Sequence, residues 1–406
     1  MPSATVHKLV HAVIDAGSSG TRLFLYEVER GPYPHVRLIA QIENPIMPNG
    51  EKEDGINNFV GSNHSHGAMN VVPLIIIPLL DKIKPLITSY NLTSHDVTVD
   101  LFGTAGMRYA EKMFGLDAID EFYEQIRQGV LGAGFIAGEV RTSDGQREEG
   151  VWTWINLNDL ERDIFRTENI PLGVVEVGGS SAQLSYPILN SVKDILNMVN
   201  PPSSIVVSIN GRTHQVYSIS YLGLGQDDAR KAMRIRLGDS SSWCFPKGFS
   251  AAKDAGDILD GVGHYRLTSD GDYQFDRCNQ SYEDLIIQAT LENAFPDLGT
   301  MGIDFVGTDA IYHATKYWEI EDNPTQLSSM ILSKCLDLSM FPGIELNESI
   351  QSQAANATYV QALLYGSSGL FKNNPSALVR ALPNRVNGAM RLSWTRGFLL
   401  QKYAQP

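Results

Sequence analysis

Two short turns rich in glycine and serine each follow a carboxylate at the end of an apolar segment. The first is Asp15-Ala-Gly-Ser-Ser-Gly20, and the second is Glu176-Val-Gly-Gly-Ser-Ser181. Glycine and serine tolerate unusual backbone dihedrals and let an anion approach several backbone N–H groups at once. The carboxylates themselves would repel phosphate, but they could hold a hydrated divalent cation that bridges phosphate oxygens. One such turn is typical of any tight hairpin, whereas two with a carboxylate in the same place indicate a polyphosphate site.

Two further segments offer groups for chemistry. Gly103-Thr-Ala-Gly106 is a third small-residue turn, and Arg108 follows it. The pair Glu148 and Glu149 precedes two tryptophans, Trp152 and Trp154. A carboxylate that aromatic bulk partly shields from water is suited to act as a general base. The same spacing also fits a solvated acidic helix start.

Other common motifs are missing or weak. The sequence has no G-x-x-x-x-G-K-[ST] run and is therefore not a P-loop protein. The pair Gly132 and Gly134 lacks the third glycine of a dinucleotide-binding turn. His64 and His66 could ligate a metal, but with no third ligand nearby they fit a polar loop better.

Composition limits the classes of partner. The 406 residues are 43% hydrophobic and 19% charged, which is typical of a globular chain long enough for two domains. A net charge of −14 argues against a broad nucleic-acid or anionic-membrane surface. The longest apolar run, residues 71–80, is far shorter than the about 20 residues that span a bilayer. We therefore expect no nucleic-acid partner and no transmembrane segment.

Hydrophobic alternation and turn residues predict an alternating α/β pattern. Strands are expected over residues 7–16, 21–29, 36–41, 97–102, 173–177, 182–186, 205–209, 213–221 and around 303–306. Helices are expected within residues 68–90, 116–131 and 226–237, and mostly from 282 onward. Residues 238–273 read as an irregular insertion. The two strand–turn–strand units around Asp15 and Glu176 form a weak internal repeat, which suggests two related domains facing one cleft.

Six segments together resemble the nucleoside triphosphate diphosphohydrolases (NTPDases), also called apyrases. They keep the family's order along nearly the whole chain. They are Ile14-Asp-Ala-Gly-Ser-Ser-Gly-Thr-Arg22, Gly103-Thr-Ala-Gly-Met-Arg108, Ser143-Asp-Gly-Gln-Arg-Glu-Glu-Gly150 with Trp154, Val175-Glu-Val-Gly-Gly-Ser-Ser-Ala-Gln183, Ser220-Tyr-Leu-Gly-Leu-Gly-Gln226 and Ser393-Trp-Thr-Arg-Gly397.

The resemblance implies an α/β fold of two actin-like, ribonuclease-H-like domains with an active-site cleft between them. The first domain would comprise residues 1–150 and 385–406, including a returning helix near residues 392–401, and the second residues 151–384. It implies cation-dependent hydrolysis of nucleoside tri- and diphosphates, such as ATP, to monophosphates. Mg²⁺ or Ca²⁺ would be the cofactor, and water would attack without a covalent intermediate.

The resemblance also implies a role for individual residues. Glu149 matches the catalytic base, and Ser181 and Gln183 match the pair that positions the attacking water. Asp15, Thr104 and Glu176 match the positions that hold the cation, largely through waters. The phosphate-binding positions correspond to Ser18, Ser19, Gly20, Thr104, Ala105, Gly178, Gly179 and Ser180. Tyr312 and Tyr365 lie in the segments that resemble the family's base-stacking region, although core packing also explains a tyrosine at helical spacing.

Two departures from the family pattern stand out. Glu176 replaces an aspartate, so a cation shell would shift by about one methylene. Arg396 stands where the family motif Trp-Thr-Leu-Gly has leucine. Neither removes a catalytic atom.

The cysteines bear on the protein's location. From spacing alone, Cys244 and Cys278 could be bridged or all three cysteines could be free thiols. The family's extracellular members close a disulfide in the segment that holds Cys244 and Cys278, which favours the bridge and an oxidising compartment. We expect a secreted, extracellular or periplasmic monomer whose signal peptide this sequence does not contain.

Two alternatives remain open from sequence. One is an exopolyphosphatase or pentaphosphate phosphohydrolase of the same fold. The other is a binding protein of the chaperone or filament kind that uses nucleotide only as a switch. The set Glu149, Ser181 and Gln183 speaks against a mere switch, and base-stacking candidates without a long basic groove speak against polyphosphate.

Overall fold

The computed structural model divides the chain into two compact units. Unit 1 comprises Met1–Pro171, Ser185–Ile219 and Asn384–Pro406, and unit 2 comprises Leu172–Leu184 and Ser220–Pro383. The domain boundaries expected from sequence stay a prediction. The structure describes residues 8–31, 33–43, 45–47, 50, 55–61, 70–164, 166–189, 203–209, 212–237, 243–245, 250–251, 267–268, 273–296, 298, 301–334, 352–383 and 392–404.

A five-stranded mixed sheet forms the centre of unit 1, in the order β3-β2-β1-β4-β5. Its strands are β1 (Lys8–Gly17), β2 (Gly20–Glu29), β3 (His35–Ile42), β4 (Thr98–Gly103) and β5 (Ile136–Thr142). β1 pairs antiparallel with β2 and parallel with β4, and β4 pairs parallel with β5. The carboxyl ends of β1, β4 and β5 therefore meet at one edge of the sheet.

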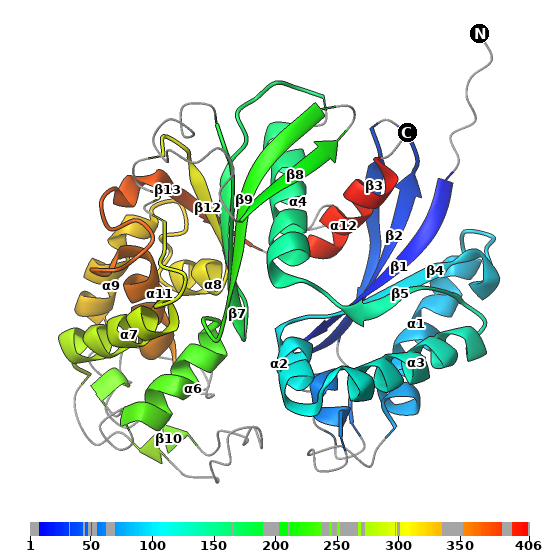
Figure 1. Ribbon diagram of the computed structural model, residues 1–406, viewed down its shortest axis with the longest axis horizontal. Coiled ribbons are helices and arrows are strands. Elements are labelled where there is room, and N and C mark those ends of the chain that lie inside the picture. Colours follow the sequence, from blue (N-terminus) through cyan, green and yellow to red (C-terminus); the bar gives the residue numbers. More distant parts are fainter. Residues whose placement is uncertain are drawn as a thin grey trace. The chain divides into compact units, whose positions relative to one another are not determined.

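Helices cover both faces of this sheet (Figure 1). They are α1 (Ile77–Thr88), α2 (Ala105–Phe114), α3 (Leu116–Gly132), α4 (Gly150–Arg162) and α12 (Trp394–Tyr403). Alternate residues of β1, including Ala12 and Ile14, share a hydrophobic core with residues of α1 and α3. The opposite face carries Phe102, whose ring packs against Trp152 on α4 and Phe398 on α12. Successive side chains of a strand point to opposite faces, and helices cover both faces, so both sets of side chains are buried.

The C-terminal helix α12 is held to the sheet at several points. Its Thr395 and the Tyr26 hydroxyl of β2 are hydrogen-bonded at 2.7 Å. Near its end, the Tyr403 hydroxyl lies 2.8 Å from Nδ1 of the buried His11 on β1. The chain's last helix therefore belongs to the unit that its first strands build.

A second, six-stranded sheet has the order β13-β12-β6-β7-β9-β8. Its strands are β6 (Gly173–Val177), β7 (Ser181–Pro187), β8 (Ser204–Ile209), β9 (Arg212–Leu222), β12 (Phe305–Asp309) and β13 (Leu378–Leu382). Without β8, the order repeats that of the first sheet, with β6 in the place of β1 and β12 in the place of β4. β6 pairs parallel with β12, as β1 does with β4. The repeat confirms the α/β class with two related halves.

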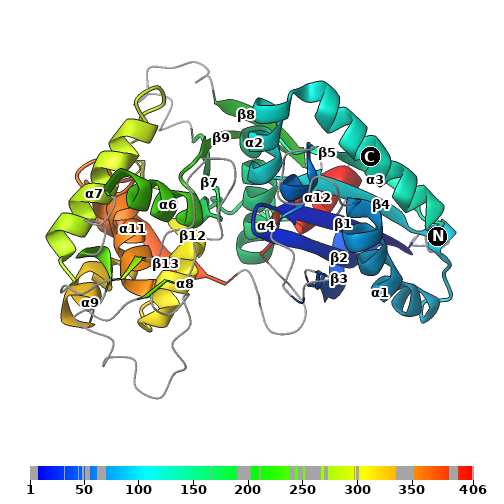
Figure 2. The same cartoon turned by 90° about the horizontal axis from the view of Figure 1, so that it is seen from below.

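Helices α6 (Gln226–Leu237), α7 (Phe275–Ala289), α8 (Ala310–Tyr317), α9 (Leu327–Lys334) and α11 (Gln353–Tyr365) belong to unit 2. Figure 2 shows α11 among the other four, and it contacts each of them. Its residues 354–360 are all buried, which fits a helix enclosed on every side.

Short elements complete the described chain. They are η1 (Ile56–Phe59), η2 (Val72–Ile76), η3 (Ser94–Asp96), η4 (Gly145–Glu149), η8 (Pro324–Gln326), η10 (Pro375–Ala377) and the two-residue strands β10 (Ser250–Ala251) and β11 (Leu267–Thr268).

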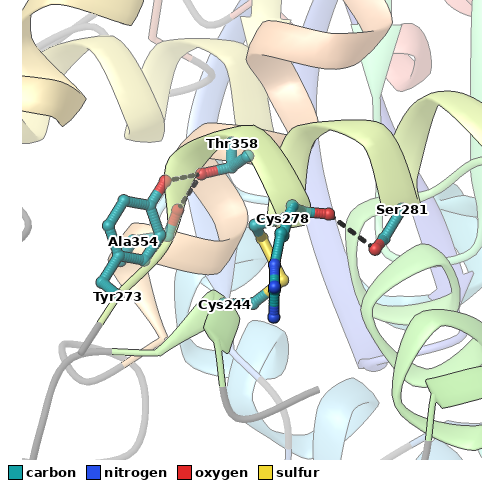
Figure 3. Close-up of a disulfide and its surroundings, with 7 residues drawn as sticks. Cys244, Tyr273, Cys278, Ser281, Ala354 and Thr358 are labelled. Atoms are coloured by element: carbon teal, nitrogen blue, oxygen red, sulfur yellow. Dashed lines mark hydrogen bonds between the residues drawn. A yellow bond between two sulfur atoms is a disulfide. The ribbon is translucent and has the colours of Figure 1, made fainter. Parts of the chain in front are cut away.

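A disulfide joins Cys244 to Cys278 in the first turns of α7, as the resemblance implied (Figure 3). The Tyr273 hydroxyl lies 2.5 Å from Oγ1 of Thr358 on α11, and Thr358 donates in turn to the Ala354 carbonyl at 2.7 Å. The start of α7 is thus fixed both covalently and by a buried hydroxyl pair.

Most expected elements are present, but several differ. Helix α2 and strands β5 and β13 were not expected, so the prediction of mostly helix after residue 282 is wrong at β13, whereas the strand expected around 303–306 is confirmed as β12. The predicted hairpin of β8 and β9 is confirmed as an antiparallel pair. His64, His66, Cys335 and most of the predicted insertion at 238–273 lie outside the described residues.

Candidate active-site residues

The predicted residues of unit 1 gather at the carboxyl edge of its sheet. Asp15 is the third-last residue of β1 and pairs with Phe102 of β4. The backbone N–H of Thr104, just beyond β4, donates to the Ala16 carbonyl at 3.1 Å. Ser143, just beyond β5, donates its N–H to the Gly103 carbonyl at 2.8 Å. These backbone bonds extend the parallel pairing, so Asp15, Thr104 and Ser143 follow neighbouring strand ends. Ligand sites of open α/β sheets form at such an edge.

The first glycine-serine turn is a tight hairpin between β1 and β2. Gly17 pairs with Gly20, which leaves Ser18 and Ser19 at the tip. Gly20 has φ +130°, a backbone conformation that a side chain would strain. Ala105 begins α2, the helix that follows Thr104. Positive charge at a helix N-terminus favours anions, so the turn and α2 offer compatible chemistry for phosphate.

Glu149 is buried in the described structure, only 5% exposed, which rules out the solvated reading. The Ser143 hydroxyl donates to its Oε1 at 2.5 Å, and the Arg108 guanidinium forms an ion pair with the same oxygen. The neighbouring Glu148 points to different partners, because it pairs with Arg141 at 2.6 Å. The expected shielding by tryptophans is not what fixes Glu149: Trp152 packs on Phe102, and Trp154 packs on His214 of β9.

A capped helical turn delivers Glu149 to this position. Residues 145–149 form one π-helical turn, and the Asp144 side chain accepts from the backbone N–H groups of Gln146 and Arg147 at 2.8 and 3.0 Å. Gly150 follows at the start of α4. A methyl group there would lie 2.7 Å from the Ser218 hydroxyl and 2.8 Å from that of Ser185, so a larger residue would have to displace these hydroxyls. The two hydroxyls are themselves 2.7 Å apart.

The second glycine-serine turn lies in unit 2, between β6 and β7. Its Gly178 N–H donates to the Ser181 carbonyl at 3.0 Å. The carbonyls of Gly178 and Gly179 accept from the N–H groups of Gln226 and Asp227, in the first turn of α6, at 2.8 and 2.9 Å. A methyl group at Gly225 would lie 2.2 Å from the Ser180 nitrogen. The segment 220–226 that resembles the family therefore buttresses this turn.

Ser181 and Gln183 are brought together on β7. The Gln183 side-chain N–H donates to the Ser181 hydroxyl at 2.7 Å, and both residues are buried. They stand two residues apart on one strand, so their side chains share a face of the sheet. A hydroxyl and an amide held this way can orient a water molecule through both donor and acceptor atoms.

Glu176 occupies the place in β6 that Asp15 has in β1. It is partly exposed and pairs with Thr308 of β12. Asp309 follows Thr308 in β12. One of its carboxylate oxygens lies 3.9 Å from the position that a methyl group would take at Gly178. A second carboxylate beside the turn is a feature that the sequence pattern did not reveal.

The predicted base-stacking tyrosines have different surroundings. Tyr312, on α8, contacts His313 with ring centroids 5.6 Å apart. Tyr365, at the end of α11, contacts Phe371 at 6.5 Å. Burial raises the pKa of the Tyr365 hydroxyl, which has no hydrogen-bond partner within the described part of the chain. Both residues are partly exposed.

The oxygen atoms of Asp15 and Thr104 are ligands that suit a hard cation such as Mg²⁺ or Ca²⁺. Among the described residues no three His, Cys, Asp or Glu side chains are grouped to ligate a metal directly. Asp15 and Thr104 offer a carboxylate and a hydroxyl at adjacent strand ends, and the Thr104 side chain does not cap α2. Mg²⁺ retains several waters and needs only one or two protein carboxylates, so this donor set fits it.

Residues 5–324 match the sequence profile of the GDA1/CD39 (nucleoside phosphatase) family. The chain belongs to this family. Among curated relatives, this GDA1/CD39-family chain is 26% identical over 258 residues to the nucleoside-triphosphatase ntp-1 of Caenorhabditis elegans, covering 61% of the chain and 45% of that relative. It is 25% identical over 356 residues to probable apyrase 3 of Arabidopsis thaliana, covering 78% and 65%.

The chain thus spans about half to two thirds of the length of these relatives. A solved structure, described as a nucleoside triphosphate hydrolase from Neospora caninum, superposes with a TM-score of 0.62 at 16% identity. The superposition covers 98% of this chain and 93% of that one, which confirms the fold. Within the described part of the GDA1/CD39-family chain, no helix is long and apolar enough to cross a membrane.

Proposed function

We propose that this chain hydrolyses nucleoside tri- and diphosphates to monophosphates and phosphate, in a reaction that depends on Mg²⁺ or Ca²⁺. Membership of the family and relatives named as an apyrase and a nucleoside-triphosphatase support the substrate class. The observation that carries the proposal is the setting of Glu149. Its buried carboxylate is fixed at the sheet edge where Asp15 and Thr104 also stand.

In the proposed reaction, Glu149 accepts a proton from the attacking water. Arg108 and Ser143 hold the carboxylate through Oε1, which fixes the direction from which the proton arrives. Ser181 and Gln183 orient the water through the hydroxyl–amide pair on β7. Because phosphoryl transfer depends mainly on alignment and charge neutralisation, such positioning supplies much of the rate.

Each turn would bind phosphate oxygens of a nucleotide through its backbone N–H groups. The phosphate contacts come from Ser18, Ser19, Gly20, Thr104 and Ala105 and from Gly178, Gly179 and Ser180. Asp15, Thr104 and Glu176 would hold the cation largely through water. A bound cation would supply positive charge beside the phosphate oxygens. Tyr312 and Tyr365 would stack on the base, which predicts breadth across nucleotides because every base has a π-face.

The test compares Glu149→Gln with the neighbouring Glu148→Gln. Glu149→Gln should bind nucleotide but lower turnover by about 10²–10⁴-fold, the usual contribution of a general base. Glu148 contacts Arg141 rather than Glu149's partners, so its variant controls for a general effect on the turn. A Glu149→Gln enzyme that keeps a tenth of wild-type ATP hydrolysis would show that another group is the base.

A substrate panel separates the alternatives. Phosphate release is measured from nucleoside tri-, di- and monophosphates and from polyphosphate, in Mg²⁺ and in excess EDTA. We expect release from tri- and diphosphates only, and none in EDTA. Preference for long-chain polyphosphate would favour an exopolyphosphatase. Slow hydrolysis of a nucleotide that stays tightly bound would favour a switch.

The disulfide supports an extracellular or periplasmic location.

A further inference from the structure

A buried carboxamide beside the first phosphate turn has no role in the reaction as described so far. Asn57 lies in η1 and is 6% exposed. Its side-chain oxygen Oδ1 is buried without a hydrogen-bond partner in the described part of the molecule. Buried amide oxygens nearly always have a partner, because losing water without gaining another donor is unfavourable. This oxygen therefore indicates a partner that the described part of the chain does not supply.

Two glycines make room for this carboxamide. A methyl group at Gly55 would lie 2.6 Å from Asn57 Oδ1 and 2.8 Å from the Ser18 carbonyl oxygen. A methyl group at Gly106 would lie 2.6 Å from the same Oδ1 and 3.2 Å from the Ser18 Cα. Gly55 also has φ +125°, which only glycine adopts without strain. Asn57 Oδ1 thus lies against the turn at Ser18 and the first turn of α2.

The chemistry of this oxygen identifies the kind of partner. A phosphate oxygen cannot donate a hydrogen bond to Oδ1, so an acceptor at this place does not serve phosphate directly. A water molecule on a divalent cation is a strong donor, and Mg²⁺ in proteins keeps several of its waters. Asp15 and Thr104 are the two proposed cation-holding groups of this unit. Asp15 lies near the end of β1, just before the Ser18 turn, and Thr104 immediately precedes α2.

We propose that Asn57 is a positioning residue that accepts a hydrogen bond, through Oδ1, from a water molecule bound to the catalytic cation. The inference rests on the proposed function, because it assumes that a hydrated cation binds beside this turn. It adds a third oxygen to the group formed by Asp15 and Thr104. The glycines at 55 and 106 then serve to admit the carboxamide to that shell.

The experiment measures binding of a non-hydrolysable nucleoside triphosphate analogue by titration calorimetry. Each protein is titrated across a range of Mg²⁺ concentrations and again in EDTA. Asn57→Ala should raise the Mg²⁺ concentration at half-maximal effect by about three- to tenfold, the value of one hydrogen bond. Binding in EDTA and the melting temperature should not fall. Asn58→Ala, in the same turn and equally buried, should leave the Mg²⁺ dependence unchanged.

Asn57→Asp distinguishes an acceptor from a donor. Aspartate keeps the oxygen and loses the N–H group, so Mg²⁺ dependence should stay within about twofold of wild type or strengthen. This variant also decides the question if Asn57→Ala does not fold. Loss of Mg²⁺-dependent binding by Asn57→Asp would contradict an acceptor role and overturn the proposal.

Equal weakening of Asn57→Ala in Mg²⁺ and in EDTA would also overturn it, in favour of a packing role. Wild-type protein that fails to bind the analogue at any Mg²⁺ concentration would refute the proposed function, and this inference with it. Wild-type binding with an unchanged Asn57→Ala would refute the inference alone.

Discussion

Arg396 of α12 donates a hydrogen bond of 2.6 Å to the carboxylate of Asp159 on α4. The same guanidinium donates to the Asn156 side-chain oxygen at 2.7 Å and to the Val36 carbonyl of β3 at 3.0 Å. Arg396 is almost completely buried. A residue that departs from the family's leucine is therefore the centre of a polar connection between two helices and the edge of the first sheet.

Replacing Arg396 with the family's leucine should destabilise this chain. Arg396→Leu leaves the largely buried Asp159 carboxylate and Asn156 without their donor, and breaking a buried ion pair costs about 3–5 kcal/mol. Chemical denaturation would measure the change in free energy of unfolding. The double variant Arg396→Leu with Asp159→Leu should cost less than the sum of the single variants, because it leaves no unpaired charge. Strict additivity would show that the two side chains do not interact.

Gly397, the next residue, tests the contact between α12 and α4 more directly. A methyl group at Gly397 would lie 1.8 Å from the Trp152 carbonyl oxygen, so Gly397→Ala must push the two helices apart. We expect a loss of about 3 kcal/mol or more in the free energy of unfolding. The matched control is Gly132→Ala at the end of α3, where nothing lies within 4 Å of the added methyl. There alanine should be neutral or stabilising by about 0.5 kcal/mol. Similar melting temperatures for both variants would contradict the close packing.

The elements that the sequence predicts well are those whose signal is local. β1 and β6 are apolar runs that end in small-residue turns, and β8 and β9 alternate on either side of a short turn. The repeat around Asp15 and Glu176 likewise corresponds to two sheets with the same five-strand order, to which the second sheet adds the edge strand β8. For these segments, backbone preference and burial favour the same structure.

The elements that sequence reasoning missed depend on tertiary contacts. Helix α2 has Gly106 in its first turn, which reads as a helix breaker until the carboxamide of Asn57 is placed against it. β5 mixes charged with apolar residues and contains Gly138, so its sequence does not look like a strand. Glycine is needed at 138 because the side chain of Asp100 from β4 packs against it. The pairing of Arg108 with Glu149 joins residues on different elements. Ser143 lies in the motif that contains Glu149, but only the folded turn of residues 145–149 directs its hydroxyl to the carboxylate.

Removing the disulfide should destabilise unit 2. Cys244 and Cys278 close a loop with a sequence separation of 34 residues, which corresponds to about 3–4 kcal/mol of lost chain entropy in the unfolded state. Cys278→Ser should therefore lower the melting temperature clearly, and reducing agent should have no further effect on the variant. Cys335→Ser, at the remaining cysteine, should keep the wild-type response to reducing agent. An unchanged melting temperature of wild type after full reduction would contradict the prediction.

A buried cluster at the opposite end of β1 from the turn should make folding sensitive to acid. His11 lies 2.5 Å from the Asp100 carboxylate, which also accepts from Lys402 at 2.9 Å, and Arg30 lies over the Tyr403 ring. Burial lowers the pKa of His11 below its ordinary value, against the opposing pull of Asp100. The Asp100 pKa is also lowered, through its hydrogen bond with His11 and the charge of Lys402, although burial acts to raise it.

The sign of the pH dependence follows from these directions. Below about pH 6.5, His11 is protonated in the unfolded chain but stays neutral in the folded chain. The free energy of unfolding therefore falls as the pH drops. Asp100 acts the same way at lower pH, where its carboxylate is protonated more easily in the unfolded chain. We expect the free energy of unfolding to decrease between pH 7.5 and 5.5, by up to about 1.4 kcal/mol per pH unit from His11. His11→Gln should flatten this dependence, whereas His35→Gln, at an exposed position on β3, should retain it. An identical slope in all three proteins would show that His11 does not titrate with folding.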